Sequence, residues 1–276
     1  MRIDAHQHFW IYNKKQHAWI DDSMQRIQQI FLPGNLKPVL EKNGIDGCVT
    51  VQADQTEEET IWLLQLADEN NFIKGVVGWV DLQATNIEAR LEHFAQFSKL
   101  KGFRHVVQGE SDPQFLARPA FRNGIKKLQR FNFTYDILIY PHQLEAAIDF
   151  VVAFPQQPFV LDHLAKPYIK QGLIKEWHGD LKKLAELENV WCKVSGLVTE
   201  ADWQQHKQSD FVPYIEAAVD AFGTDRIMFG SDWPVCLVAA SYEKVVQIVY
   251  EVLKKFSAEE QQKFFSLNAI RFYNLK

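Results

Sequence analysis

The sequence lacks features that mark several large classes of protein. It has only three cysteines, an odd number without the spacing of a disulfide framework or a zinc motif. Cys48 and Cys192 lie in apolar runs, so we expect reduced, buried thiols. No apolar run approaches the roughly 20 residues of a transmembrane helix. Asp4 interrupts the first residues before the apolar core that a signal peptide needs. These absences favour a cytoplasmic protein.

Positive charge is also scarce. The chain has 30 Lys and Arg residues against 35 Asp and Glu residues, with a formal net charge of -5 and a sequence pI of about 6.0. Nucleic acids and anionic membranes are bound by basic surfaces, so we expect neither as a partner and favour a small molecule. The composition, 47% hydrophobic and 24% charged, is typical of a globular protein and leaves the oligomeric state unknown.

No Gly-x-Gly-x-x-Gly turn follows any apolar segment. The chain instead alternates short apolar segments, typical of strands, with longer segments of helical spacing. The expected strands are one that ends at His6 and His8 and seven at 47–52, 73–82, 100–107, 133–140, 159–163, 190–195 and 226–230. The expected helices are 35–43, 54–71, 86–98, 118–131, 142–154, 176–187, 210–222, 241–256 and 258–273.

Strict alternation of strands and helices implies a parallel sheet. A (β/α)8 barrel commonly takes about 250 residues, and the chain has 276. We therefore predict the α/β class and a single-domain (β/α)8 TIM barrel over residues 1–276. An open, doubly wound sheet is the alternative, which the missing glycine motif disfavours.

The first expected strand carries two histidines two positions apart. Side chains at such positions point the same way, so His6 and His8 should aim at one place beyond the strand. Neutral imidazole is a common metal ligand. A His-x-His pair alone is weak evidence and more often marks two ordinary histidines, so its meaning depends on the other strand ends.

Polar residues stand at the carboxyl ends of most expected strands, which in a barrel meet on the face that carries the active site. They are Gln52, Asp54, Arg104, His105, Tyr140, Asp162, His163, Lys166, Lys193, Ser195, Asp232 and Trp233. Because strand side chains alternate, only one of Arg104 and His105 should face the barrel centre. The same holds for Asp162 and His163. Each residue alone has a structural explanation, but unpaired buried polar groups cost about 1–3 kcal/mol each, so the gathering favours a functional site.

Three motifs at these ends resemble a known family. They are Asp-Ala-His-Gln-His-Phe-Trp at 4–10, Leu-Asp-His-Leu-Ala-Lys-Pro at 161–167 and Gly-Ser-Asp-Trp-Pro at 230–234. This wording resembles the amidohydrolase superfamily, its amidohydrolase-2 branch and, within it, the sugar-lactone hydrolases of the L-fuconolactonase and L-rhamnonolactonase type. The resemblance implies a hydrolase that opens a sugar-acid lactone, such as that of a 6-deoxy sugar.

The resemblance also assigns site residues. It makes His6, His8, His163 and Asp232 both the catalytic residues and the ligands of one divalent metal, zinc first and manganese second; metal-free catalysis stays open, because related lactonases of both kinds exist. A two-metal site is not expected, since Arg104 and His105 stand where a bridging lysine or glutamate would be. Asp232 would be the general base. The candidates for substrate binding are Trp10, Gln52, Asp54, Arg104, His105, Lys166 and Trp233.

Two other functions stay open. One is a metal-dependent decarboxylase of the same superfamily, with the metal on the same residues. The other is a non-catalytic barrel that only binds a sugar acid. Few arginines stand near the carboxyl ends of the expected strands, where the substrate would bind. A neutral or singly charged lactone therefore fits better than one with two carboxylates.

Overall fold

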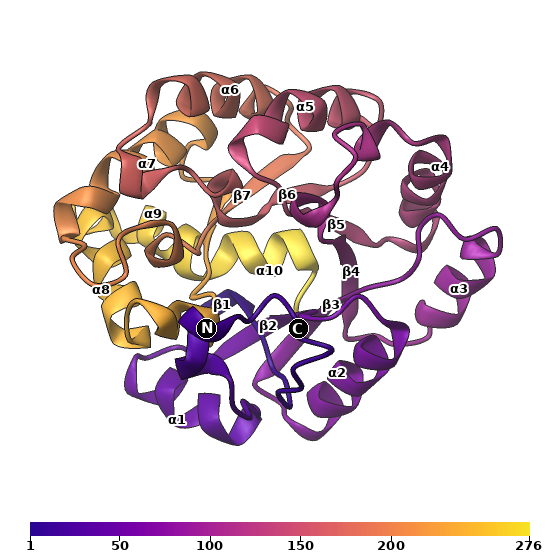
Figure 1. The fold of residues 1–276 in the computed structure, drawn as a ribbon, viewed down its shortest axis with the longest axis horizontal. Coiled ribbons are helices and arrows are strands. Elements are labelled where there is room, and N and C mark those ends of the chain that lie inside the picture. Colours follow the sequence, from indigo (N-terminus) through magenta and orange to yellow (C-terminus); the bar gives the residue numbers. More distant parts are fainter.

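The computed structural model describes all 276 residues and contains a barrel of eight parallel strands, as predicted (Figure 1). The strands are β1 (Ile3–Gln7), β2 (Gly47–Val51), β3 (Ile73–Gly78), β4 (Leu100–His105), β5 (Thr134–Ile137), β6 (Phe159–Leu161), β7 (Val190–Val194) and β8 (Ile227–Phe229). Each pairs with the next in chain order. The ring closes where His8 N donates to Trp233 O at 2.7 Å and Asp232 N donates to His6 O at 2.8 Å.

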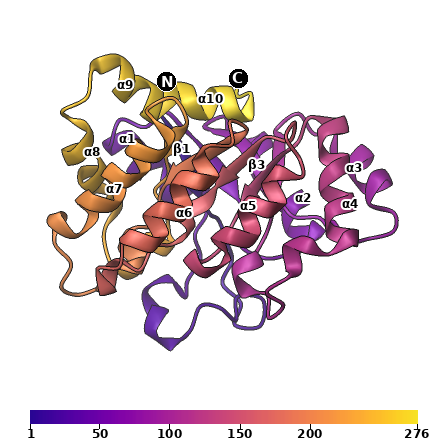
Figure 2. The same ribbon diagram turned by 90° about the horizontal axis from the view of Figure 1, so that it is seen from above.

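Helices surround the barrel and close the end opposite the carboxyl ends of its strands, which we call the lower end. They are α1 (Pro33–Lys42), α2 (Glu57–Glu69), α3 (Ile87–Phe94), α4 (Pro119–Leu128), α5 (Leu144–Val152), α6 (Lys175–Ala185), α7 (Gln208–Phe222), α8 (Tyr242–Leu253), α9 (Ala258–Gln262) and α10 (Asn268–Tyr273). The single helix expected at 258–273 is interrupted by a π turn at Lys263–Leu267. In Figures 1 and 2, α10 crosses the barrel at the end where both termini lie, opposite the long loop after β1.

The core has two parts. A cluster of 69 buried residues lies between the strands and the outer helices, and a cluster of 12 fills the lower barrel interior together with residues of α10. All three cysteines are free and buried, which confirms the prediction made for Cys48 and Cys192. None of the helices combines the length and the apolar character needed to span a bilayer.

An irregularity in β1 sets the direction of its histidines. The pairing of β1 with β2 shifts between Asp4 and Gln7. Asp4 therefore faces outward, where its Oδ2 accepts from the Tyr242 hydroxyl at 3.0 Å. His6 and His8 both turn inward, and their Nε2 atoms lie 3.2 Å apart. The predicted convergence of the two histidines is present, although Asp4, two positions before His6, points the opposite way.

Candidate active site

Four residues from three regions of the chain meet at the carboxyl ends of the strands. Asp232 Oδ1 lies 3.3 Å from His8 Nε2, 3.9 Å from His6 Nε2 and 4.0 Å from His163 Nε2. All four side chains are buried. The structure thus brings together the residues that the motifs predicted, around one carboxylate oxygen.

The second nitrogen of two imidazoles has a partner that orients the ring. His8 Nδ1 lies 2.8 Å from Val51 O, a pure acceptor, so Nδ1 carries the proton. His163 Nδ1 lies 2.8 Å from Ser195 Oγ. The carbonyl leaves a lone pair on His8 Nε2 directed at the cluster, and the serine hydroxyl, which can accept from Nδ1, is compatible with the same tautomer of His163. Metal-binding histidines are usually held in this way.

The donor set fits one divalent metal ion. Atoms bound to zinc at about 2.0–2.2 Å lie roughly 3–4 Å from one another. The nitrogen and oxygen atoms of His6, His8 and Asp232 lie within 4.8 Å of one another, and His163 borders this group. Three imidazoles and one carboxylate are ligands that zinc and other transition metals accept.

Charge in the cluster favours an ionised Asp232, and burial favours neutral His6 and His163. Burial opposes ionisation of Asp232, but His163, His8 and Lys166 together hold the pKa of its carboxyl below the ordinary value. Burial lowers the pKa of His163 to about 4 and that of His6 well below its usual range. At neutral pH the cluster therefore contains the Asp232 carboxylate beside the neutral imidazoles of His6 and His163.

A left-handed turn after β6 places His163. Residues 163 to 166 have φ angles of 53°, 54°, 56° and 52°, and none is glycine. Such residues cost roughly 1–2 kcal/mol each, so the fold must hold the turn in place. One restraint is the Trp177 indole, which donates to Leu164 O at 2.7 Å. Another is the close packing of Gly196 against His163, where an added Cβ would lie 2.6 Å from the ring nitrogen Nδ1.

Because of this turn, the side chains of Asp162 and His163 do not alternate between the inside and the outside of the barrel as predicted. We expected only one of Asp162 and His163 to face the barrel centre, and that expectation is wrong because β6 ends at Leu161. His163 borders Asp232, while Asp162 Oδ1 lies 3.3 Å from His6 Nδ1. Both side chains therefore contact the cluster.

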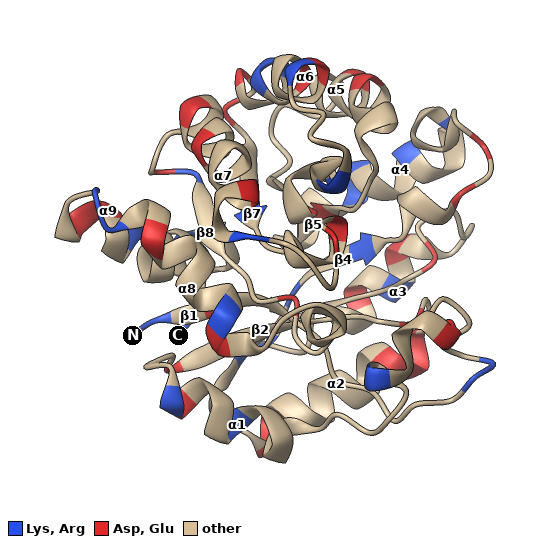
Figure 3. Ribbon diagram, turned by 60° about the vertical axis from the view of Figure 1, so that its left-hand side comes forward, with Lys and Arg blue, Asp and Glu red and all other residues tan.

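Below the cluster, a fully buried charge network continues into the barrel. Lys193 Nζ lies 2.5 Å from Asp136 Oδ2, 3.0 Å from Asp162 Oδ1 and 3.1 Å from His6 Nδ1. Arg104 Nη1 donates to Asp162 Oδ2 at 3.0 Å, and the Tyr273 hydroxyl of α10 donates to Asp136 Oδ2 at 2.8 Å. Figure 3 shows the charged segments of β4, β5 and β7 inside the ring of helices. Asp136 was not predicted for the site; its only signal was a carboxylate inside an apolar strand.

Some of the predicted substrate-binding residues lie at the cluster, and others lie outside the barrel. Arg104 reaches the cluster, with Nη1 3.3 Å from His6 Nε2, and Gln52 positions it by accepting from Nη2 at 3.0 Å. Of the pair Arg104 and His105, only the arginine faces the centre, as the alternation predicted. His105 lies outside the barrel between the Trp79 indole, at 3.2 Å, and Glu110, at 2.7 Å.

Two predicted tryptophans pack in the core instead of lining the open mouth. The Trp10 indole donates to Gln29 O at 3.0 Å and thereby fastens the long loop after β1. The Trp233 ring packs edge-on against Phe31, with ring centroids 5.1 Å apart. Large aromatic rings gain most from burial, and packing against the loop after β1 buries these two rings more fully than a position at the open mouth would. Asp54 and Lys166 are partly exposed at the rim and stay candidates.

Comparisons with known proteins agree with this geometry. The family model described as amidohydrolase matches residues 3–275. An L-fucono-1,5-lactonase from Burkholderia multivorans is 38% identical over 100% of this chain and 96% of that protein, and one from Burkholderia ambifaria is 37% identical over 87% and 83%. A crystal structure of an amidohydrolase from Burkholderia multivorans with bound zinc has a TM-score of 0.97 and 38% identity, and the match covers 100% of both chains.

Proposed function

Because the chain belongs to the amidohydrolase family, we propose that it hydrolyses the ring ester of a sugar-acid lactone, with a 6-deoxy sugar lactone such as L-fucono-1,5-lactone as its substrate. One observation carries the proposal: a buried, ionised Asp232 stands among three imidazoles at the barrel mouth. The names of the two Burkholderia relatives support the same substrate class.

Asp232 is the general base in this proposal. Its Oδ1 takes a proton from water, and the water oxygen attacks the lactone carbonyl carbon. The resulting oxyanion lies next to Arg104, whose guanidinium provides positive charge and N–H donors. As the bond between the carbonyl carbon and the ring oxygen breaks, Asp232 returns the proton to that oxygen. This transfer regenerates the Asp232 carboxylate, and the open-chain hydroxy acid that forms then releases its own acid proton to the solvent.

His6, His8, His163 and Asp232 would hold a divalent metal, and we propose zinc over manganese because three of the four ligands are imidazoles. When bound, the ion supplies Lewis-acid polarisation of the lactone carbonyl. The protein's own contribution is orientation: Val51 O and Ser195 Oγ fix the rings of His8 and His163.

A pH-indicator assay tests the function. The purified enzyme, before and after chelation, is given a panel of aldonolactones, and we expect acid release to be fastest from a 6-deoxy sugar lactone. Activity lost on chelation and restored by zinc would support the metal; activity that survives chelation would remove it from the mechanism. Asp232→Asn should lower kcat by at least about 100-fold, the lower range for a general base. No release from any lactone would overturn the proposal and direct the search to hydroxybenzoate decarboxylation, whereas binding without turnover would indicate a sugar-acid-binding barrel.

A further inference from the structure

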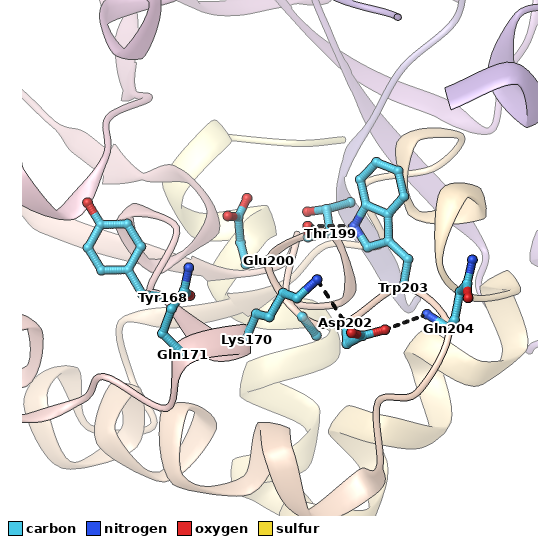
Figure 4. A pocket seen from close by; sticks show the side chains of 9 residues that line it. Tyr168, Lys170, Gln171, Thr199, Glu200, Asp202, Trp203 and Gln204 are labelled. Carbon is cyan, nitrogen blue, oxygen red and sulfur yellow. Dashed lines mark hydrogen bonds and ion pairs between the residues drawn. The ribbon is translucent and has the colours of Figure 1, made fainter. Parts of the chain in front are cut away.

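A cavity of about 560 Å³ lies between the loops that follow β6 and β7. Figure 4 shows Tyr168 and Lys170 from the first loop and Thr199, Glu200, Asp202 and Trp203 from the second. Lys170 and Asp202 form an ion pair at 3.4 Å and are both well exposed. The Trp203 indole donates to Thr199 O at 2.9 Å, which fixes the ring as a wall of the cavity.

Glu200 is the more deeply placed carboxylate of this cavity. Its side chain is 20% exposed, against 42% for Asp202. Its cationic partner is Lys166, whose Nζ lies 3.7 Å from Oε1. That separation exceeds a hydrogen bond, so the carboxylate oxygens and the ammonium N–H groups both retain bonding capacity. A pair of this kind suits a ligand that carries both donors and acceptors.

The pair belongs to the same electrostatic environment as the catalytic cluster. Lys166 ends the left-handed turn that begins at His163, and it contributes to lowering the pKa of Asp232. Burial raises the pKa of Glu200; Lys166 opposes this rise, and the negative charge of Asp232 adds to it. The short turn Val198–Glu200 packs against the turn Val235–Val238 that follows Asp232, and Lys166 ends the turn that carries His163. A ring bound over Asp232 would therefore have Glu200 and Lys166 beside it.

Resting on the lactonase function proposed above, we propose that Glu200 and Lys166 form the subsite that binds hydroxyl groups of the sugar ring. The two oxygens of Glu200 accept hydrogen bonds from neighbouring hydroxyls, and the Lys166 ammonium donates to a hydroxyl oxygen. Bonds to charged groups are the stronger ones, so this pair gives a polyhydroxylated lactone its advantage over a lactone without hydroxyls.

The test compares two lactones of the same ring size, L-fucono-1,5-lactone and unsubstituted δ-valerolactone. Glu200→Gln keeps the size of the side chain and removes its charge. We expect kcat/KM for the sugar lactone to fall about 10- to 100-fold, the range for hydrogen bonds to charged groups, with little change for δ-valerolactone. Lys166→Met should act in the same direction. Asp202→Asn, in the exposed part of the same cavity, is the matched control and should leave both rates unchanged.

The outcomes separate the subsite from the function. Equal losses on both lactones in folded variants, judged by unchanged Tm, would overturn the subsite, because a general disturbance of Asp232 slows every hydrolysis alike. An unchanged rate on the sugar lactone would overturn it as well. A wild-type enzyme inactive on both lactones would overturn the proposed function and the subsite with it, whereas an active wild type with an insensitive Glu200→Gln variant overturns the subsite alone.

Discussion

The barrel interior has an apolar side, formed by β1 to β3, and a charged side, formed by β4 to β7, which also adds Val160 and Trp191 to the apolar cluster. The inner side chains of β1 to β3 join the apolar cluster under the site; they are Ile3, Ala5, Val49, Val51 and Val77. All of the charged network comes from β4 to β7; its members are Arg104, Asp136, Asp162 and Lys193. His6 contacts Lys193 from the apolar side. An apolar wall needs only the correct volume, whereas each buried charge needs a specific partner, so the two sides should respond differently to substitution.

Two buried aspartates show the same contrast at single residues. Asp162 faces Lys193 and Arg104, and although burial opposes ionisation, these cations and His6 hold its pKa well below the ordinary value. Asp4 is equally buried but has only neutral partners, the Ser231 backbone N–H at 2.9 Å and the Tyr242 hydroxyl at 3.0 Å. Burial therefore raises the pKa of Asp4 to about 6.

The largest expected effect is on the charged side. Lys193→Met nearly preserves side-chain length but leaves Asp136 and Asp162 without their shared cation, so we expect a loss of about 3–5 kcal/mol in the free energy of unfolding. On the apolar side, Ile3→Val should lose only about 0.5–1.5 kcal/mol. Urea denaturation measures both. A Lys193→Met loss no larger than that of Ile3→Val would show that the two sides do not differ.

The stability contributed by the buried Asp4 carboxyl should depend on pH. Its pKa in the folded state is about 6, above the ordinary value of 3.8 for this carboxyl. Its contribution to stability is therefore fully present below pH 4 and is lost as pH rises through 6, by on the order of 3 kcal/mol. Unfolding of wild type and Asp4→Asn at a series of pH values should show the wild type losing stability relative to the variant over this interval. A constant difference would refute the shifted pKa.

Close packing beside His163 gives the third prediction. Gly196 and Gly172 have similar φ angles, 64° and 67°, but an added Cβ meets the His163 ring only at Gly196. Both alanine variants carry the same backbone strain, and only Gly196→Ala displaces the histidine. We expect Gly196→Ala to lose about 100-fold in kcat, the effect of a misplacement of about 1 Å, and Gly172→Ala to keep it. Similar activity in the two variants would show that His163 tolerates the shift.

The residues that the sequence predicted well are those whose position depends only on a strand end. His6, His8 and Asp232 converge because β1 and β8 are neighbours in any closed barrel of this order. The fold followed from the alternation of strands and helices and the family from the three motifs, and both predictions are confirmed. Alternation predicted that only one of Arg104 and His105 faces the centre, and the structure shows that it is Arg104.

The remaining features depend on contacts that a linear pattern does not contain. The left-handed turn at 163–166 contains no glycine, so its conformation could not be predicted. For this reason the contact of both Asp162 and His163 with the cluster was not expected. Asp136 and Lys193 lie inside strands, and their pairing depends on register across the barrel. Trp10 and Trp233 were placed at the mouth because of their position in the chain, while the loop after β1 supplies the core in which they are buried.

The joining of β1 to β8 has a consequence for biosynthesis. The ribosome makes His6 and His8 long before Asp232 and the Tyr273 of α10. During translation the histidines therefore lack their carboxylate, and β1 lacks one of its two neighbours, until β8 and Asp232 have emerged. Contacts so distant in sequence form late in folding. Catalytic activity therefore requires that the ring of strands has closed between β1 and β8. Nascent or partly folded chains should show no lactonase activity.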